Sequence, residues 1–376
     1  MQSPEFFAAL SNRSILDQRF ATSLNKETTE ILTELAKWLR ERINREGSTI
    51  ASRKRYEKLL TDIEKRTQQI YSDISELYEQ QFKPFAYDEA DFVAKSMQAV
   101  VATDVIVESP SNRALWNAIT KNPLQIGGNN TFVDFDDLIK GLGVNSKKIA
   151  SVISGGYSQG LTLEEMKQAI VGTRAQKYSD GIIDKSRREA ESIVRTSINH
   201  IASTSRDEVY KQNDDIVYGY TILATLDTRT TPNCRYFDGK TYRYSDKYNP
   251  LPPFHFSCRS QIVAEFYNEK LNNTGSTRSA NFKGGEDLKK GTVGQVDASQ
   301  QYYDVLKRQP VSQQDAVLGK ARGLIFRNSG LSAQEFRNAL TDNMGNPLTL
   351  QQMANENKKI LEYMNKNEFL SEYVGG

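Results

Sequence analysis

The chain has 376 residues, which is enough to bury at least one sizeable core and suggests two or three domains. A formal net charge of +2 excludes a polycation built to coat nucleic acid, and only two cysteines exclude a disulfide-stapled scaffold. The mean hydropathy of -0.60 suits long, solvated helices better than a compact enzyme with a large apolar core. Because no signal peptide and no stretch of about 18 apolar residues is present, we expect a protein without a membrane span, made in a reducing cytoplasm.

Residues 1–145 are predicted to form a helical N-terminal region. Apolar side chains fall on one helical face over 24–43, and a second stripe over 56–81 repeats with spacings of three and four. Such a stripe serves both a long helix packed on its neighbour, which is the interpretation that we favour, and a helix docked on a partner chain. Pro84 is expected to end the second helix, and the acidic residues of 88–91 to begin another.

Residues 146–267 are predicted to form a small α+β central domain. Thr162 and Glu165 have the spacing of a capping box at the start of one helix. An apolar stripe predicts a longer helix that begins near 190 and ends near 214. The β-branched and aromatic residues of 217–226 alternate as in a strand.

Residues 268–295 are polar and contain glycine, which predicts a linker. Residues 296–376 are predicted to be a helical C-terminal segment, in which Ser332 and Glu335 form another capping box. The expected fold is therefore mainly α, with long N-terminal helices, a small α+β central domain and a short sheet near the cysteines.

The residues of greatest chemical interest lie in one block, 226–260, which holds both cysteines and one of the two histidines. Cys234, His255 and Cys258 offer three soft metal ligands, with a His-x-x-Cys spacing that one turn can present. Because both cysteines and one histidine lie in one short segment, we expect their side chains to form a local site there. The candidates are a metal clip, a redox pair and a nucleophile site.

A zinc site is the first of these interpretations. Structural zinc normally takes four ligands, usually from paired elements, but Thr231 and Ser260 stand where further cysteines would complete such pairs. Asp238 or Asp227 could supply an oxygen instead, with Asp238 as the candidate for the fourth position. Zinc is the only cofactor that the sequence suggests.

Other interpretations stay open. The cysteines could be small buried hydrophobes in a tightly packed loop, with His255 bonded to a backbone carbonyl. A disulfide between them is chemically feasible, although a reducing cytoplasm disfavours it. Cys258, His255 and Asp238 could form the thiol, imidazole and carboxylate of a hydrolase or transferase. Since no nucleophile elbow or glycine-rich oxyanion loop is present, we predict no catalytic residue, no enzymatic activity and no small-molecule substrate.

The block also contains residues for which we predict structural roles. Asp238 and Gly239 are expected to form a turn, in which the glycine supplies a positive φ. Asp227 and Arg229 could pair with each other or bond the backbone of the following loop. Arg259, next to the second cysteine, is assigned to the same structural motif.

The order of these residues resembles a known family, the head morphogenesis domain of the phage Mu F-like minor head proteins. The likeness rests on Leu-Asp-Thr-Arg-Thr-x-Pro-x-Cys at 226–234, Asp-Gly-Lys at 238–240 and Pro-Pro-x-His-x-x-Cys-Arg-Ser at 252–260. Similar segments upstream and downstream extend it over about 150–350, whereas residues 1–140 match only in being helical.

The resemblance implies a minor capsid protein in the virion head of a tailed phage, made in the cytoplasm of the bacterial host. It would act in head assembly at or near the portal, with the portal protein, scaffold or major capsid protein as partners. Some relatives are thought to accompany the DNA, so contact with packaged DNA and ejection with it are further expectations. Some members carry extra cysteines where this chain has Thr231 and Ser260, so a four-thiol site is excluded here.

Lys307, Arg308, Lys320 and Arg322 are the candidates for contact with DNA phosphates. An ordinary solvated helix face is the alternative, and we favour it. A non-specific DNA-binding protein remains an alternative function, for which salt-sensitive binding of random duplex would be diagnostic.

Overall fold

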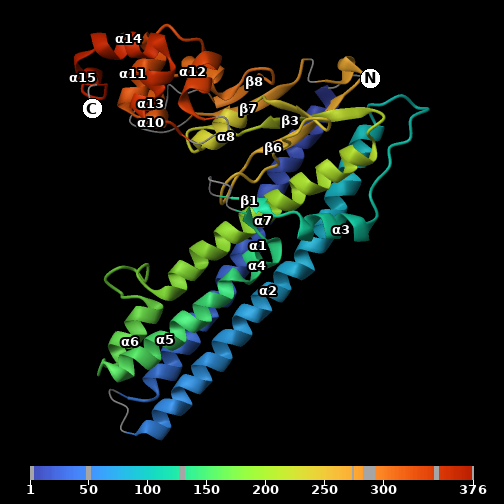
Figure 1. Ribbon diagram of the computed structural model, residues 1–376. Coiled ribbons are helices and arrows are strands. Elements are labelled where there is room, and N and C mark those ends of the chain that lie inside the picture. Colours follow the sequence, from blue (N-terminus) through green and yellow to red (C-terminus); the bar gives the residue numbers. More distant parts are fainter. Residues whose placement is uncertain are drawn as a thin grey trace.

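The computed structural model describes residues 4–47, 52–126, 132–272, 275–282, 293–342 and 347–374. The fold is mainly α with short sheets, as the sequence predicts. Figure 1 shows a long arm of helices joined to a broader part that carries the sheets and the C-terminal helices. None of the helices within these ranges combines the length and the apolar character needed to cross a membrane.

Three long helices form the spine of the arm, and they are α1 (Pro4–Asn44), α2 (Arg53–Gln98) and α7 (Ile182–Gln212). α2 runs antiparallel to α1, with the Thr28 hydroxyl 3.2 Å from the Tyr78 hydroxyl. α7 runs parallel to α2, and Tyr71 and Ser186 join the two through a hydroxyl contact of 2.8 Å. The predicted stripe over 56–81 is buried or partly buried against these neighbours of the same chain, which confirms the packed-helix interpretation.

The predicted helix end at Pro84 is wrong, because α2 continues without interruption to Gln98. Proline lacks the N–H that would bond the carbonyl four residues earlier, so it weakens the helix locally. Phe82 and Phe85 are nevertheless buried on either side of it, and the Phe85 ring stacks on Phe20 of α1 with centroids 5.0 Å apart. Burial of these rings outweighs the lost hydrogen bond, so packing overrides the local signal.

Shorter elements pack around the spine: α3 (Asn112–Lys121), β1 (Leu124–Gln125), β2 (Phe132–Val133), α4 (Phe135–Lys140), α5 (Val144–Ser158) and α6 (Leu163–Val171). Thr162 and Glu165 form the predicted capping box at the start of α6. At the far end of the arm the rings of Tyr56 and Tyr157 stack with centroids 3.8 Å apart, which fixes α5 against α2.

In the described residues β1 and β2 pair as a two-stranded antiparallel sheet, and the other strands form two three-stranded sheets. The first has the order β5-β3-β6, all antiparallel, from β3 (Val217–Leu223), β5 (Thr241–Arg243) and β6 (Gln261–Phe266). The second has the order β4-β7-β8, from β4 (Leu226–Asp227), β7 (Thr277–Asn281) and β8 (Val293–Asp297), and its β4–β7 pair is parallel. The predicted strand over 217–226 is therefore confirmed as β3, with β4 directly after it.

The prediction of a linker over 268–295 is wrong where the structure describes it, since β7 and the start of β8 lie within this segment. β7 alternates exposed and buried side chains, and its inward residues are Arg278 and Ala280. Because one inward residue is charged and the outward ones are polar, the strand has the composition of a linker. Residues 273–274 and 283–292 lie outside the described residues.

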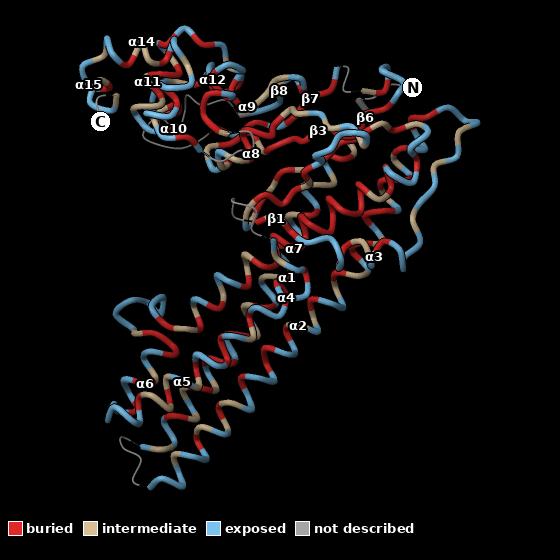
Figure 2. Tube along the Cα trace, viewed as in Figure 1, coloured by how far each residue is buried: buried red, intermediate tan, exposed pale blue. Residues whose placement is uncertain are grey.

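The buried apolar residues form two clusters. The larger joins the arm helices to the first sheet, and the smaller joins β4 and β7 to the C-terminal helices. Figure 2 shows buried positions concentrated along the inner faces of the spine helices and around the sheets. The C-terminal helices are α9 (Tyr302–Lys307), α10 (Val311–Leu318), α11 (Lys320–Asn328), α12 (Ala333–Leu340), α13 (Leu350–Glu356), α14 (Lys358–Lys366) and α15 (Glu368–Ser371). Ser332 and Glu335 form the predicted capping box of α12.

A charged cluster lies inside the larger core, where α1, α2 and α7 meet. Glu89 of α2 is fully buried and accepts hydrogen bonds from Arg13 Nε at 2.6 Å and from Arg206 Nε at 2.8 Å. Arg206 is only 1% exposed and also reaches Asp17 at 3.3 Å. Each charge has an opposite partner, as burial in a low-dielectric interior requires.

The charged cluster predicts a pH dependence of stability. Burial, followed by repulsion from Glu89, raises the pKa of Asp17 to about 7, although Arg206 and Arg13 act in the opposite direction. Because this folded pKa lies above the unfolded one, the folded state binds more protons between about pH 4 and about pH 7. The free energy of unfolding should therefore fall as pH rises through that range, and Asp17→Asn should flatten the decrease in urea unfolding at about pH 5 and about pH 8. Asp73→Asn, at an exposed position, should keep the wild-type slope, and an unchanged slope in Asp17→Asn would contradict the assignment.

Candidate metal centre

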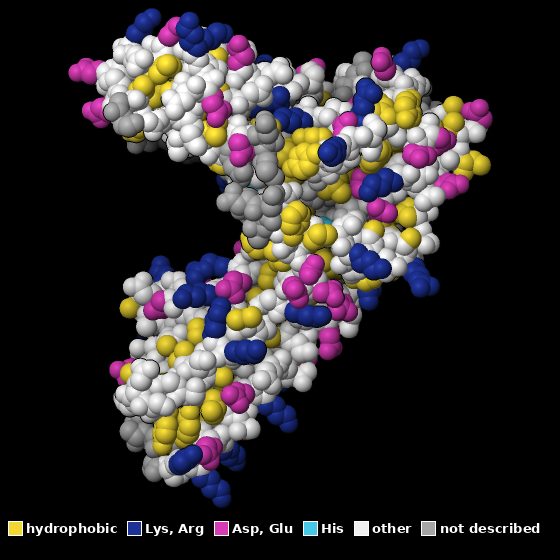
Figure 3. Space-filling model, viewed as in Figure 1, with side chains coloured by type: hydrophobic (Ala, Val, Ile, Leu, Met, Phe, Trp, Pro, Cys, Tyr) yellow, Lys and Arg dark blue, Asp and Glu magenta, His cyan; other side chains and the backbone are white. Residues whose placement is uncertain are grey.

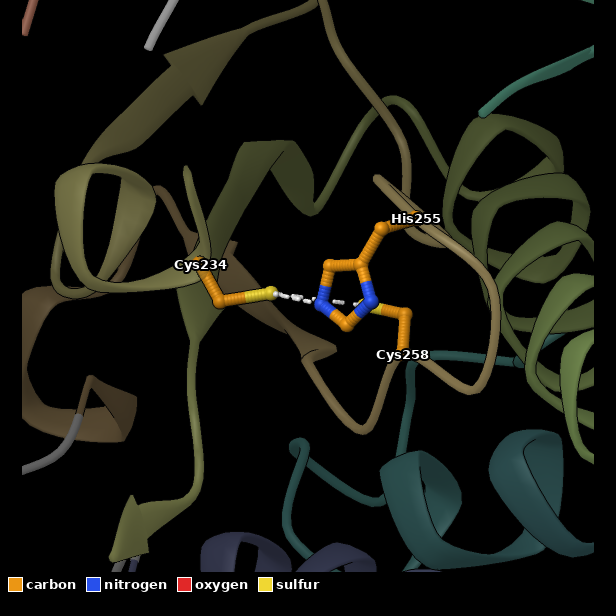
Figure 4. A group of neighbouring side chains, drawn as sticks. All are labelled: Cys234, His255 and Cys258. Carbon is orange, nitrogen blue, oxygen red and sulfur yellow. Dashed lines mark hydrogen bonds between the residues drawn. The ribbon is translucent and has the colours of Figure 1, made fainter. Parts of the chain in front are cut away.

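The three soft side chains come from two segments that flank the first sheet. Cys234 lies on α8 (Pro232–Phe237), a short helix capped by the Thr231 hydroxyl, which accepts from the Cys234 N–H at 3.4 Å. His255 and Cys258 lie in the loop that leads into β6. Figure 4 shows the three side chains pointing toward one another. Sequence analysis missed α8, although a threonine followed by proline is a signal for a helix start.

The ligand atoms of Cys234, His255 and Cys258 all lie within 4.8 Å of one another. Cys234 Sγ is 3.0 Å from His255 Nε2 and 3.6 Å from Cys258 Sγ. His255 Nδ1 is 2.8 Å from the backbone oxygen of Phe256. A proton on Nδ1 would be donated to that carbonyl, which leaves the Nε2 lone pair facing the sulfurs, as in metal-ligating histidines.

These distances are compatible with a tetrahedral zinc ion. With Zn–S of about 2.3 Å and Zn–N of about 2.0 Å, the S–S edge should be about 3.8 Å and the S–N edge about 3.5 Å. The sulfurs of Cys234 and Cys258 are already close to the first value. The Cys234–His255 contact would have to lengthen by about 0.5 Å, which a loop side chain that is partly exposed can allow.

The electrostatics of the cluster favour one thiolate. The hydrogen bond with Cys258, together with burial, raises the pKa of the Cys234 thiol. Burial alone would raise the pKa of Cys258 as well, but hydrogen bonds from Cys234 and His255 outweigh it and hold this pKa well below its usual range. Burial opposes the charged form of His255, yet its contact with Cys258 raises the His255 pKa. A thiolate is the form of cysteine that binds metals.

The structure does not bring Asp238 to the cluster, so its prediction as fourth ligand is wrong. Its carboxylate is fully buried and accepts from Ala224 N at 2.7 Å, Tyr302 N at 2.6 Å and Arg278 at 2.8 Å. The thiol–imidazole–carboxylate set therefore lacks its carboxylate. The predicted turn is confirmed, with Gly239 at a φ of +73° and too little room for a side chain beside Gln301.

Replacing Asp238 by alanine should destabilise the protein by about 3–5 kcal/mol, because Arg278 would be left as a buried charge without its carboxylate. The change also removes the acceptor of two backbone N–H groups that join β3 to α9. Urea unfolding measures the loss, and Asp246→Ala is the control, since that exposed carboxylate accepts only from a local turn. A loss of less than about 1 kcal/mol at Asp238 would show that the ion pair is not what holds this junction together.

Asp227 and Arg259 form a two-bond ion pair, with N–O distances of 2.6 and 2.9 Å. Asp227 also accepts from the backbone N–H of Arg229 at 3.0 Å, which is one of the two alternatives expected from the sequence. The Arg229 guanidinium itself is mostly exposed, with Nε 3.7 Å from the carboxylate. The ion pair thus ties β4 to the residue that follows Cys258.

The four cations proposed for DNA contact lie in the C-terminal helices, where most of them have partners within the chain. Lys307 donates to the Leu331 carbonyl at 2.9 Å, and Arg322 donates to the Leu348 carbonyl at 2.7 Å. Lys320 lies over the Phe369 ring, 5.1 Å from its centroid. Arg308 is exposed and contacts Gln300. These roles favour the solvated helix face over a dedicated phosphate-binding surface.

The other histidine is not part of any such site. His200 of α7 is buried, and its Nε2 is 2.8 Å from the Ile119 carbonyl. Burial lowers its pKa to about 4, so the ring is neutral at physiological pH. His200 therefore packs within the helical core, away from the three soft ligands.

Comparison with known families concerns the segment that contains the cluster. Residues 147–263 match the family described as Phage Mu protein F like protein. The match runs from α5 into β6, includes all three soft ligands and confirms the predicted resemblance over this segment. The family points to a phage head morphogenesis protein associated with the virion and with other head proteins. No curated protein and no solved structure matches the chain.

Proposed function

We propose that the protein is a minor head protein of a tailed phage and acts in head assembly at or near the portal. The family match over 147–263 is the observation that carries this proposal. The shape of the molecule supports it, because the arm extends away from the sheets and offers a long surface to neighbours. Figure 3 shows hydrophobic side chains at the free end of the arm, where Tyr157 and Leu161 are exposed. Exposed apolar groups of this kind suit an assembly interface with the portal protein, scaffold or major capsid protein.

The second part of the proposal is that Cys234, His255 and Cys258 hold a zinc ion as a structural clip. Distances near those of a tetrahedral site, contacts that lower the pKa of the Cys258 thiol and an oriented imidazole support it. The clip would join α8 to the loop before β6. It would thereby hold together the two ends of the segment 226–260, which lies within the family match.

We also propose that the protein is not an enzyme. The cysteine nucleophile is the strongest alternative, but Cys258 is 0% exposed and His255 bonds a backbone carbonyl in place of Asp238. A nucleophile has to reach a substrate, and its base has to be oriented by a third group. Cys258 does not meet the first condition, and the carboxylate that would stabilise a charged imidazole is absent, since Asp238 pairs with Arg278.

Quantitative mass spectrometry of purified particles tests the head assignment. The protein should be present in heads at few copies per particle, and cross-linking should join its arm to the portal, scaffold or major capsid protein. Absence from purified heads, together with normal head assembly in a phage that lacks the gene, would contradict it. Comparison of full particles with particles that have released their DNA decides whether the protein is ejected.

Binding of random duplex DNA at increasing salt separates the head protein from a non-specific DNA-binding protein. The latter requires a steep fall of log affinity with log salt, set by the number of phosphates contacted. We expect weak binding, because Lys307, Lys320 and Arg322 are engaged within the C-terminal helices. A steep slope that Arg308→Ala and Lys320→Ala reduce would favour the DNA-binding alternative.

A further inference from the structure

A small cavity adjoins Cys234 and His255, two of the three ligands of the proposed zinc clip. It has a volume of about 40 Å³, and its walls include Cys234, His255, Ser260 and Arg229. A space of this size holds one water-sized ligand. His255 is partly exposed and Arg229 is exposed, so the cavity can be reached from solvent.

One wall of the cavity carries a buried hydroxyl. Ser260 is only 1% exposed, and its Oγ makes no hydrogen bond of good geometry with the described residues, although it also contacts the Cys234 thiol. An unpaired buried hydroxyl is costly, and a donor or acceptor within the cavity would remove that cost. The hydroxyl therefore marks the cavity as a place for a polar ligand.

The described part of the chain supplies three ligands to the site and no fourth one. Among the described histidine, cysteine and acidic residues, only Cys234, His255 and Cys258 have ligand atoms in this cluster. The two nearest acidic candidates are committed elsewhere, Asp227 to Arg259 and Asp238 to Arg278. Zinc sites with three protein ligands keep their fourth position for water or another small donor.

We propose that the zinc ion keeps one exchangeable coordination position, facing this cavity, which water occupies beside Ser260 and which small anions can take. This rests on the proposed zinc clip. An incoming anion replaces the water as a ligand, and no bond within the protein forms or breaks. The site would then bind a ligand from outside as well as hold α8 to β6.

The charges around the cavity select an anion over a cation. Metal binding would displace the Cys234 proton, so two thiolates would balance the two positive charges of the metal, and Arg259 is balanced by its ion pair with Asp227. The Arg229 side chain is 80% exposed and lines the same cavity, which adds a positive charge at the entrance. A small anion that enters the cavity would therefore find a neutral metal centre and a net positive charge at the entrance, which favours its binding over that of a cation.

Cobalt(II) substitution of the full-length protein tests the proposal, with azide as the probe anion. Cobalt bound to thiolates gives charge-transfer bands, and its d–d bands report the coordination number. Wild type and Ser260→Ala should show a saturable change of the d–d bands with azide. In Ser260→Cys a third thiolate should close the site, raise the charge-transfer intensity by about one half and abolish the azide response.

The outcomes separate the two levels of the proposal. If neither cobalt nor zinc binds the wild type, the zinc clip itself is wrong. If cobalt binds and Cys258→Ser removes it, but azide leaves the wild-type d–d bands unchanged, the clip stands and the exchangeable position is overturned. Circular dichroism tests whether each variant keeps its fold. The azide response of the wild type decides the matter even if Ser260→Cys does not fold.

Discussion

Cys258→Ser is expected to lose its bound zinc and to lower the free energy of unfolding by more than about 4 kcal/mol. The wild type, purified without added metal, should contain about one zinc per chain. The effect is large because Cys234 and Cys258 are 24 residues apart in sequence, and the metal would be the bond that joins their segments. Metal analysis by mass spectrometry and urea unfolding on the same samples measure both quantities.

The control has to separate loss of metal from general loss of stability. His200→Gln changes the other histidine, which is buried and bonds the Ile119 carbonyl 2.8 Å away. It should cost about 1–3 kcal/mol and leave the zinc content at the wild-type level. A metal-free wild type whose two thiols both react under native conditions would contradict the clip and leave a packed loop.

The parts of the fold that sequence analysis could predict depend on local signals. Capping boxes such as Thr162–Glu165 act within four residues, and a stripe such as that of α2 needs only one helix to be visible. β6 was missed because it is buried on both faces and shows no alternation. Pairing of β7 with β4 depends on residues more than 50 positions away, so no local pattern carries it.

The candidate site was predictable in its ligands and less so in its surroundings. Cys234, His255 and Cys258 stood out because the chain has so few soft side chains. Sequence cannot tell which nearby carboxylate reaches them, and Asp238 instead bonds residues of β7 and α9. The partner of Asp227 was missed for the same reason.

Sequence analysis also missed the charged cluster around Arg206. Its partners Glu89 and Asp17 are 117 and 189 residues away in the chain. A signal did exist, since Arg206 continues the apolar stripe of α7 four residues after Ala202. A charged residue at a core position of a helix predicts a buried partner, although it does not identify that partner.

Arg206→Met should lower the free energy of unfolding by about 3–5 kcal/mol, the second large effect that we expect. Methionine can fill much of the space, so the loss comes mainly from Glu89, which is 0% exposed and would keep only Arg13 as a partner. Adding Glu89→Gln should recover part of the loss, because the unpaired carboxylate is then removed. Urea unfolding of the two single variants and the double variant gives the coupling between the sites.

The same helix provides the control that distinguishes a buried charge from a surface one. Arg195 of α7 pairs with Glu191 at 3.0 Å and also donates to Gln18 of α1 at 3.2 Å, and the side chains of Arg195 and Glu191 are partly exposed. Arg195→Met should therefore change stability by no more than about 1 kcal/mol. Two results would contradict this account: Arg206→Met costs no more stability than Arg195→Met, or the double variant loses the sum of the two single losses. Either result would show that Arg206 does not compensate the charge of Glu89. The junction of α1, α2 and α7 would then depend on its apolar contacts alone.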